Sequence, residues 1–172
     1  TRSGGSLEEG IVIEVREADL ARDRAGIRAL WIAYLTWGND GLQAHYGFRM
    51  HDPVAAVDAD LEAVAKFQPP NGHLVVASDD DGSIVGVGCV QRLGPEGAEI
   101  KRMYVDPGVR RGGVGRRILQ QLIDHATADG YTELRLDSPG FMHGAHALYR
   151  SLGFGDVAPY AESEIPAAYR SH

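Results

Sequence analysis

The chain has 172 residues, of which 44% are hydrophobic, with one cysteine and a formal net charge of -7. This length is enough for one domain with its own hydrophobic core, so folding needs neither a disulfide nor a metal. The acidic balance disfavours binding to nucleic acid through its phosphates, and no apolar stretch approaches the length of a membrane-spanning helix.

The ends of the chain and its cysteine give three further expectations. Residues 1–10, rich in Ser and Gly, are expected to be a flexible N-terminal arm or a cloning remnant, and residues 11–172 a single domain. Cys89 lies in an apolar run, which favours a buried thiol over a catalytic one. No basic-then-apolar signal opens the sequence, so we expect a cytoplasmic location.

The first half of the domain is predicted to be a strand and two helices. Residues 11–16 alternate apolar and charged side chains, as a half-buried strand does, and residues 27–35 carry apolar side chains at helical spacing. Residues 38–51, rich in Gly, His and aromatic residues, are predicted to form a loop. Asp52 and Pro53 then predict the cap and first turn of a second helix.

The second half alternates strands and helices. Residues 73–78, 84–93 and 99–105 predict three strands of an antiparallel meander, because Asp- and Gly-rich turns separate them. An amphipathic helix (115–129), a strand (132–137) and a short helix (144–151) follow, and one more strand is predicted from Phe154 onward. The order predicts an α/β class with a mixed sheet covered by helices.

The densest functional signal is VDPGVRRGGVG at residues 105–115, between a strand and a helix. Glycines there let a ligand approach the backbone, and N–H groups at a helix start favour a phosphate. Four arginines, at positions 110, 111, 116 and 117, add positive charge. The same pattern also fits a tight turn with solvated arginines. Neither a P-loop nor a dinucleotide fingerprint is present.

Two motifs in this order resemble the GNAT N-acetyltransferases. Arg110-x-x-Gly113-x-Gly115 matches the pyrophosphate loop of that family, and ALYRSLGF at residues 147–154 resembles its LYxxLGF segment. The resemblance implies a GNAT acyl-CoA N-acyltransferase-like fold with six to seven strands and about four helices. It also implies acetyl-coenzyme A as cosubstrate, wedged between the strand that ends at Val105 and the strand at 132–137.

The resemblance further implies the coenzyme contacts. Main-chain groups of Met103 and Val105 would pair with the pantetheine arm, and backbone N–H groups of residues 111–115 would hold the pyrophosphate. The full set implied is Met103, Tyr104, Val105, Arg110, Arg111, Gly112, Gly113, Val114, Gly115 and Arg116. Two positions depart from the family: Met142 stands where many relatives carry Asn, and the sequence stops at His172, where relatives usually add a final strand.

The catalytic pair implied by the resemblance is Tyr149 and Glu99. Tyr149 would protonate the departing thiolate, a transfer from a phenol near pKa 10 to a thiol near 8.5 that costs about 2 kcal/mol. Glu99 would act as base, and strict strand alternation would put it on one face with Lys101 and Met103. The alternatives are a core tyrosine, a solvated glutamate, and water as the base.

The acceptor and metal expectations rest on weaker patterns. Trp37, His45 and Tyr46, with Asp40 and Phe48, are the candidates for the acceptor pocket, because loops often carry specificity. The alternative is a loop packed by its own aromatics. His143 and His146 lie three apart on a predicted helix, but no third ligand accompanies them, so no metal is expected.

The function predicted is an N-acetyltransferase that moves acetyl from acetyl-coenzyme A to an amine of a small molecule by direct attack in a ternary complex. The alternatives are a peptide N-terminal or lysine acetyltransferase, and a coenzyme-binding regulatory module without turnover. The partners expected are a small-molecule amine acceptor, no nucleic acid and no membrane, with a homodimer left open.

Overall fold

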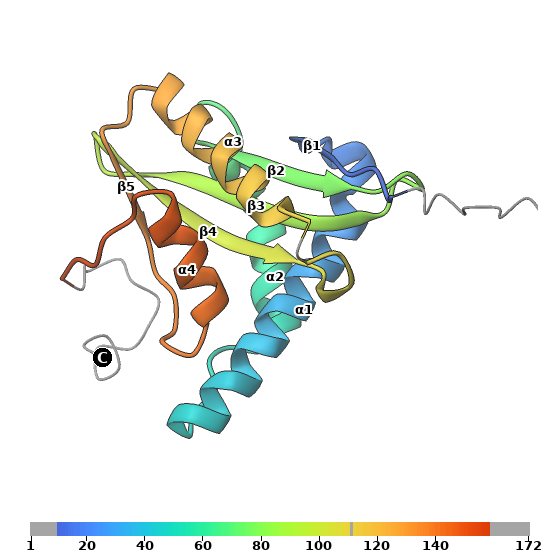
Figure 1. The fold of residues 1–172 in the computed structure, drawn as a ribbon, viewed down its shortest axis with the longest axis vertical. Coiled ribbons are helices and arrows are strands. Elements are labelled where there is room, and N and C mark those ends of the chain that lie inside the picture. The colour runs from blue at the N-terminus through green and yellow to red at the C-terminus, as the bar shows by residue number, and fades with distance from the viewer. Residues whose placement is uncertain (1–9, 111, 159–172) are drawn as a thin grey trace, which may run out of the picture.

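A computed structural model describes residues 10–110 and 112–158. Arg111, most of the predicted N-terminal arm and the chain after residue 158 lie outside the described residues. Five strands form one sheet in the order β1-β2-β3-β4-β5 (Figure 1). They are β1 (Glu14–Glu17), β2 (Gly72–Ser78), β3 (Ile84–Leu93), β4 (Gly97–Val105) and β5 (Glu133–Leu136).

The sheet is mixed, as predicted. The first four strands are antiparallel neighbours, whereas β5 runs parallel to β4. The described residues therefore hold five strands in place of the expected six to seven. The predicted α/β class and the antiparallel meander are confirmed.

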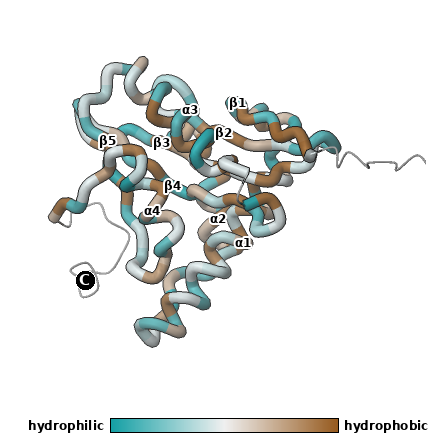
Figure 2. Tube along the Cα trace, in the orientation of Figure 1, coloured by the Kyte–Doolittle hydropathy of each residue, from teal (hydrophilic) through white to brown (hydrophobic). Residues whose placement is uncertain are grey.

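Helices cover both faces of the sheet. They are α1 (Leu20–Tyr46), α2 (Pro53–Glu62), α3 (Val114–Ala128) and α4 (His143–Ser151). In Figure 1, α3 and α4 lie on the near face, whereas α1 and α2 lie behind the sheet. The hydropathy colours alternate along α1 and α3 in Figure 2, because each helix turns one apolar side to the sheet.

Each face of the sheet has its own hydrophobic core. On the α3 side, Val75, Ile118, Leu119 and Leu122 are fully or almost fully buried. On the α1 side, Ile27, Trp31, Phe67 and Val87 are buried, with the Trp31 and Phe67 rings edge to face at 5.8 Å. Burying each such side chain contributes about 1.5–3 kcal/mol, so these two layers supply most of the stability.

The predicted loop at residues 38–51 is mostly wrong, because α1 continues to Tyr46 and ends at Gly47, whose φ is 76°. The glycines that indicated a loop have another purpose. A Cβ on Gly41 would lie 2.2 Å from the Phe141 ring, so the helix needs glycine there to pass close to the segment before α4. The predicted Asp52 cap is confirmed, since its Oδ1 accepts from the Ala55 N–H at 2.8 Å.

The strand predicted from Phe154 onward does not form within residues 154–158, and the remaining residues lie outside the described part of the chain. Phe154 packs its ring 6.0 Å from that of Tyr149, and Asp156 pairs with Arg150 at 3.3 Å. These side-chain contacts hold the segment without a β-ladder. Gly153 and Gly155 also lower its strand propensity.

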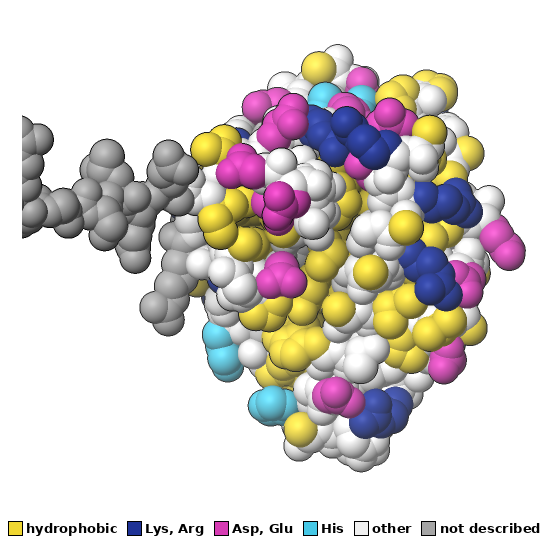
Figure 3. Space-filling model, turned by 90° about the vertical axis from the view of Figure 1, so that its right-hand side faces the viewer, with side chains coloured by type: hydrophobic (Ala, Val, Ile, Leu, Met, Phe, Trp, Pro, Cys, Tyr) yellow, Lys and Arg dark blue, Asp and Glu magenta, His cyan; other side chains and the backbone are white. Residues whose placement is uncertain are grey.

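The surface in view in Figure 3 carries acidic and basic side chains side by side around a strip of hydrophobic ones. No helix among the described residues is long and apolar enough to cross a membrane.

Candidate active site

The sheet opens between β4 and β5. The two strands pair only from Gly97 with Glu133 to Ile100 with Leu136. β4 continues to Val105, whereas β5 ends at Leu136 and the chain turns toward α4. The second half of β4 therefore has β3 on one side and, among the described residues, no strand on the other. This opening is where the sequence predicted the coenzyme between β4 and β5.

A β-bulge in β4 sits at the mouth of the opening. Arg102 has a φ of 54°, unusual for a residue with a side chain, and the β3–β4 register shifts between Val87 and Cys89. The Arg102 Nε donates to Asp60 Oδ2 of α2 at 3.0 Å, and Lys66 Nζ donates to the other oxygen of Asp60 at 2.7 Å. Asp60 thus anchors the bulge to the α1–α2 layer.

The bulge corrects the predicted alternation of β4. Glu99 and Lys101 share the α1 face, as expected, with their charged atoms 3.5 Å apart. Because Arg102 also points to that side, the strand then reverses, and Met103 packs with the α3-side core. Met103 is therefore not on the face of Glu99, and the alternation prediction is wrong for this residue.

The start of α3 suits an anion. Gly113 is the N-cap residue with a φ of 72°, and no described side chain caps the helix. The first N–H groups of α3 consequently point out of the helix without a side-chain acceptor, where the helix dipole favours negative charge. A pyrophosphate would meet this need, so the observed turn fits the expected coenzyme.

Defined contacts hold Arg110 and Arg116 beside the predicted phosphate loop, whereas Arg117 donates to the Ile13 carbonyl. Arg110 Nε donates to the Val105 carbonyl at 2.9 Å, and its guanidinium lies 5.3 Å from the Tyr104 ring centre and 5.9 Å from that of Trp37. Arg116 donates to Ser151 Oγ at 2.7 Å, which links the start of α3 to the end of α4. These contacts hold both cations beside the loop.

Glu99 lies in a small pocket where β4 and β5 diverge. The pocket has a volume of about 120 Å³, and Glu99 is only 4% exposed, so the reading of a solvated glutamate is wrong. Its walls come from α1, the segment 50–56, β4 and the segment after β5: Tyr34, Leu35, Gly38, Asn39, Leu42, Met50, His51, Ala56, Ile100, Lys101, Arg102, Asp137, Pro139 and Met142.

Tyr149 packs on the inner side of α4. It is 9% exposed and lies in the α3-side core beside Leu148 and Phe154. Burial raises the pKa of its phenol above the ordinary value, and the nearby Tyr34 raises it further. Tyr34, which raises the pKa of Tyr149, belongs to α1, whereas Tyr149 belongs to α4. The phenol therefore stays protonated throughout the physiological pH range.

The three predicted acceptor residues lie on α1, not on a loop. Trp37 is 41% exposed and packs near Tyr34, Tyr104 and Phe141, with ring centres 5.9–6.4 Å apart. His45 stacks on Phe141 at 4.9 Å, and Tyr46 lies at the helix end. Trp37 is next to the Glu99 pocket, whereas none of the three lines it.

Sequence reasoning missed the pocket residues Tyr34, Asn39 and Asp137. Asn39 is 6% exposed and holds the chain after α1, because its side chain bonds both the Met50 N–H at 2.9 Å and the His51 carbonyl at 3.1 Å. The signal was available, since residues 34, 35, 38, 39 and 42 share one side of a continuous helix. Predicting a loop at 38–51 hid it.

Cys89 is the buried thiol that the sequence predicted. It is 0% exposed, and burial raises its pKa to about 12. Its sulfur donates to the Lys101 carbonyl at 3.2 Å. The thiol is therefore unsuited to nucleophilic attack.

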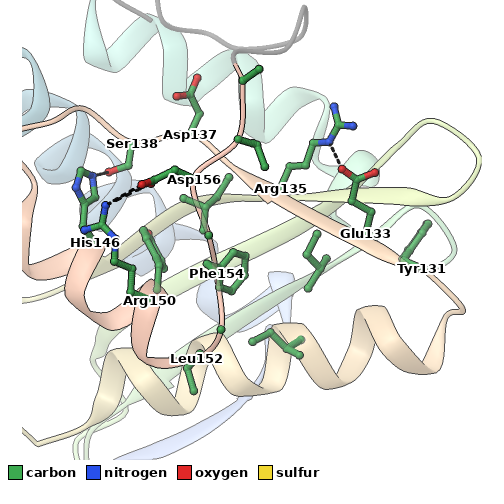
Figure 4. A pocket seen from close by; sticks show the side chains of 18 of the residues that line it. Tyr131, Glu133, Arg135, Asp137, Ser138, His146, Arg150, Leu152, Phe154 and Asp156 are labelled. Carbon is green, nitrogen blue, oxygen red and sulfur yellow. Dashed lines mark hydrogen bonds and ion pairs between the residues drawn. The ribbon is translucent and has the colours of Figure 1, made fainter. Parts of the chain in front are cut away.

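A larger cavity, of about 1260 Å³, lies on the other side of β5 (Figure 4). Arg135 with Glu133, Arg150 with Asp156, and His146 with Ser138 form polar contacts around it, while Phe154 and Leu152 lie between β5 and α3. His146 is thus bonded to Ser138 Oγ at 3.1 Å. The lining of this larger cavity includes residues 152–158, and the extra strand was expected to begin within that segment, at Phe154.

The chain matches the model of the acetyltransferase (GNAT) family over residues 25–154. It is 34% identical over 112 residues to an uncharacterised N-acetyltransferase of Schizosaccharomyces pombe, a match covering 64% of this chain and 69% of the relative. It is 38% identical to the IAA acetyltransferase of Azospirillum brasilense (59% and 64% covered) and 37% identical to the N-alpha-acetyltransferase RimI of Mycobacterium tuberculosis (61% and 62%). The matches thus span about two thirds of each relative.

Solved structures share the fold. An acetyltransferase of the GNAT family from Staphylococcus aureus Mu50 superposes with a TM-score of 0.68 at 18% identity, covering 92% of both chains. The structure of yncA from Salmonella typhimurium, solved with acetyl-CoA, gives 0.66 at 23% identity, covering 83% of this chain and 79% of yncA. At these identities the likeness concerns the fold alone.

Proposed function

Because this chain belongs to the acetyltransferase (GNAT) family, we propose that it transfers acetyl from acetyl-coenzyme A to an amine of a small molecule by direct attack in a ternary complex. The observation that carries the proposal is the opening of the sheet beside an uncapped helix start. β4 and β5 part after Ile100 and Leu136, and α3 begins at the glycine turn that faces this opening.

The coenzyme site proposed is the predicted set on β4 and the start of α3. Backbone N–H groups of Gly112 to Gly115, together with Arg111, would hold the pyrophosphate, and Arg110 and Arg116 would add charge. Main-chain groups of Met103, Tyr104 and Val105 would meet the pantetheine arm along the open edge of β4. The missing β5 partner for this half-strand supports that assignment.

Direct attack is favoured because the only cysteine cannot serve as an acyl carrier. The sequence contains one cysteine, Cys89, which is fully buried with a pKa of about 12. A covalent acetyl-enzyme through this thiol would need both access and a thiolate, and it has neither.

Glu99 is the proposed base. Its carboxylate lies in the pocket at the divergence of the strands, next to the Lys101 ammonium at 3.5 Å. From there it would take a proton from the acceptor ammonium, directly or through one water, and leave a neutral amine to attack. Its position supports this assignment, because Glu99 lines the pocket although it is only 4% exposed.

Tyr149 is the proposed acid. An acid must hold its proton before the reaction, and burial ensures that this phenol does. The raised pKa also increases the cost of the transfer beyond the about 2 kcal/mol expected for an unperturbed phenol. The thiolate would therefore need to form next to the hydroxyl, so that proton transfer and bond cleavage occur together.

The size of the Glu99 pocket favours a small acceptor. A volume of about 120 Å³, bordered by α1 and by residues 50–56, suits a compact amine better than a folded protein surface. A peptide N-terminus or a lysine side chain stays as the alternative, because one relative is an N-alpha-acetyltransferase and Trp37 offers an exposed ring beside the pocket. A coenzyme-binding module without turnover is the second alternative.

The test is thiol release from acetyl-coenzyme A over a panel of small amines and short peptides with unblocked N-termini. We expect turnover with at least one small amine and little with peptides. Turnover with peptides alone would replace the small-molecule acceptor. Binding of the coenzyme without turnover on any acceptor would favour the regulatory module.

A further inference from the structure

A cluster of histidines and carboxylates lies where β1, β2 and the end of α3 meet, on a part of the sheet remote from the β4–β5 opening. It consists of Glu17 at the end of β1, His73 near the start of β2, and His125 and Asp129 at the C-terminal end of α3. None of these residues belongs to the proposed acetyl-transfer site. Sequence analysis considered only His143 and His146 as metal ligands.

The sheet register brings Glu17 and His73 to the same face. Glu17 pairs with Val75, which lies in the core beneath α3. His73 is two residues from Val75 on β2, so its side chain points to the same face. Side chains from two different strands therefore meet below α3.

The periodicity of α3 supplies the other half of the cluster. Arg117 donates to the Ile13 carbonyl, and Gln121 donates to the Val15 carbonyl, both at 2.9 Å. One more step of four residues along the helix and two along the strand places His125 next to Glu17, with Nε2 and Oε1 3.3 Å apart. One side of α3 thus contacts the chain at every second residue from Ile13 to Glu17.

The possible metal-binding atoms of Glu17, His73 and His125 lie close together. Glu17 Oε1 lies 2.5 Å from His73 Nδ1, and the ligand atoms of Glu17, His73 and His125 all lie within 4.8 Å of one another. The two imidazole rings are parallel with centres 4.2 Å apart. Tetrahedral zinc ligands lie about 3.3 Å apart at the bond lengths that zinc prefers, and the metal lies in the plane of each imidazole that binds it. Binding therefore requires the half-buried His125 ring to turn out of its stack on His73.

Asp129 completes the pattern from the far side of His73. Its Oδ2 lies 2.7 Å from His73 Nε2, the ring nitrogen that faces away from Glu17. Histidines that bind metals usually donate their second N–H to a carboxylate, which fixes the tautomer and the ring orientation. His73 is 8% exposed, so this orientation is built into the packed interior.

The electrostatics favour a cation. Two carboxylates surround two imidazoles, and the C-terminal end of α3 adds the negative end of a helix dipole. Arg92 donates to the Tyr131 hydroxyl at 3.1 Å, which raises the pKa of Arg92, and the negative charge of Asp129 raises it further. Two imidazole nitrogens and one carboxylate oxygen are a set of three protein ligands that binds zinc with water in the fourth position.

We propose that Glu17 Oε1, His73 Nδ1 and His125 Nε2 bind a divalent cation of the zinc class, with Asp129 orienting His73. The ion joins the edge strand β1 to β2 and to the end of α3, three elements distant in the sequence. We expect no part for the ion in acetyl transfer, because the site lies away from the opening in which that reaction is proposed. The inference is independent of the proposed acceptor and mechanism.

The competing reading is that both nitrogens of His73 carry hydrogen and bridge Glu17 and Asp129 without a metal. In that case His125 only stacks on His73. The two readings differ in what His125 contributes, since a metal needs its nitrogen and a proton bridge does not.

The test is zinc binding to the full chain after treatment with a chelator, by calorimetry and by the visible absorption of Co²⁺ as a substitute. We expect one ion per chain and a rise in Tm on adding Zn²⁺. His125→Ala should abolish both, although it keeps both carboxylate partners of His73. Asp129→Asn should weaken binding by roughly 10-fold to 100-fold without abolishing it.

His143→Ala is the control, since His143 is also a helical histidine but is exposed and lies outside the cluster. It should bind zinc as the unmutated chain does. An unmutated chain without zinc binding or a Tm response, or zinc binding that survives in His125→Ala, would overturn the proposal in favour of the proton bridge. Loss in His143→Ala would equally overturn it, by placing the ion elsewhere.

Discussion

Glu99 and Lys101 lie on the same face of β4 with their charged atoms 3.5 Å apart, and the bulge at Arg102 turns the strand over immediately after them. Glu99, Lys101 and Arg102 all face the α1 side, and Met103 and Val105 then turn to the α3 side. This places a buried carboxylate at the point where β5 leaves the sheet. A base in this position reaches the opening without occupying the proposed coenzyme edge.

Glu99→Gln tests the base. We expect coenzyme affinity to stay near normal, and kcat/KM to fall by roughly 10²-fold to 10⁴-fold, most at low pH, where the acceptor amine is protonated. The measurement is a pH profile of thiol release. Glu96→Gln is the control, because Glu96 is an exposed glutamate of the turn that leads into β4. Full activity of Glu99→Gln at every pH would reassign the proton to water.

Much of the fold could be predicted because its elements carry strong local patterns. The three central strands and α3 were each predicted to within two residues, since their apolar residues alternate or recur at helical spacing. The end of α1 could not be predicted in the same way. Gly38 and Gly41 indicate a turn locally. The close packing of Phe141 explains the glycine at position 41, and nothing in the structure requires one at position 38.

Parts of the candidate site could likewise be predicted from the sequence, and parts could not. The phosphate loop is contiguous in sequence, so its glycines and arginines could be found from the motif. The bulge could not, because an arginine with positive φ has no sequence mark and depends on Asp60, 42 residues earlier. The zinc-class cluster was missed for a related reason, since its ligands lie on three separate elements.

Acetyl-coenzyme A binding is tested by Gly113→Glu. We expect the coenzyme at 100 times its Kd to stabilise the unmutated chain by about 2.7 kcal/mol, and the variant to lose this gain because the glutamate fills the phosphate space with like charge. Gly130→Glu is the matched control at the other end of α3, where φ is also positive, at 86° against 72°. Both variants lose about 1–2 kcal/mol from strain alone.

Thermal unfolding with and without the coenzyme separates the two effects. Gly130→Glu should melt lower than the unmutated chain and still respond to the coenzyme. An unmutated chain whose Tm ignores saturating coenzyme would contradict the binding site, as would an equal response of both variants.

Acid sensitivity is predicted for the pair of Arg16 and Asp23. The Asp23 side chain is 1% exposed and accepts from Arg16 at 2.6 and 3.0 Å and from the Asp19 N–H at 2.8 Å. The hydrogen bonds from Arg16 lower the pKa of Asp23 in the folded state. Its contribution to the free energy of unfolding is therefore complete above the unfolded pKa of about 3.9 and is lost as pH falls through the folded pKa.

Asp23→Asn should cost about 3 kcal/mol at pH 7, because it leaves Arg16 without its buried charged partner and with only the exposed Glu14 at 3.9 Å. The difference from the unmutated chain should shrink as pH is lowered below about 4 in urea unfolding. Asp58→Asn is the control: the Arg28–Asp58 pair at 2.8 Å is exposed, so a much smaller cost than that of Asp23→Asn is expected. Equal costs for the two variants would show that burial of Asp23 contributes nothing.

Tyr149→Phe tests the acid. The change removes one hydroxyl and keeps the ring that packs against Phe154 at 6.0 Å, so fold and coenzyme binding should stay nearly intact. If the hydroxyl protonates the thiolate, kcat should fall by roughly 10²-fold to 10⁴-fold with little change in KM for acetyl-coenzyme A. The measurement is steady-state thiol release together with coenzyme-dependent Tm.

A thioester with a more acidic leaving thiol separates acid catalysis from positioning. Such a thiolate needs its proton less, so the defect of Tyr149→Phe should shrink with it. Tyr131→Phe is the control. Tyr131 lies just before β5, away from the opening, and its hydroxyl accepts a hydrogen bond from Arg92 at 3.1 Å. Near-normal kcat in Tyr149→Phe would make Tyr149 a core residue alone. An equal loss with every leaving group would instead mean that the hydroxyl positions the thioester and donates no proton.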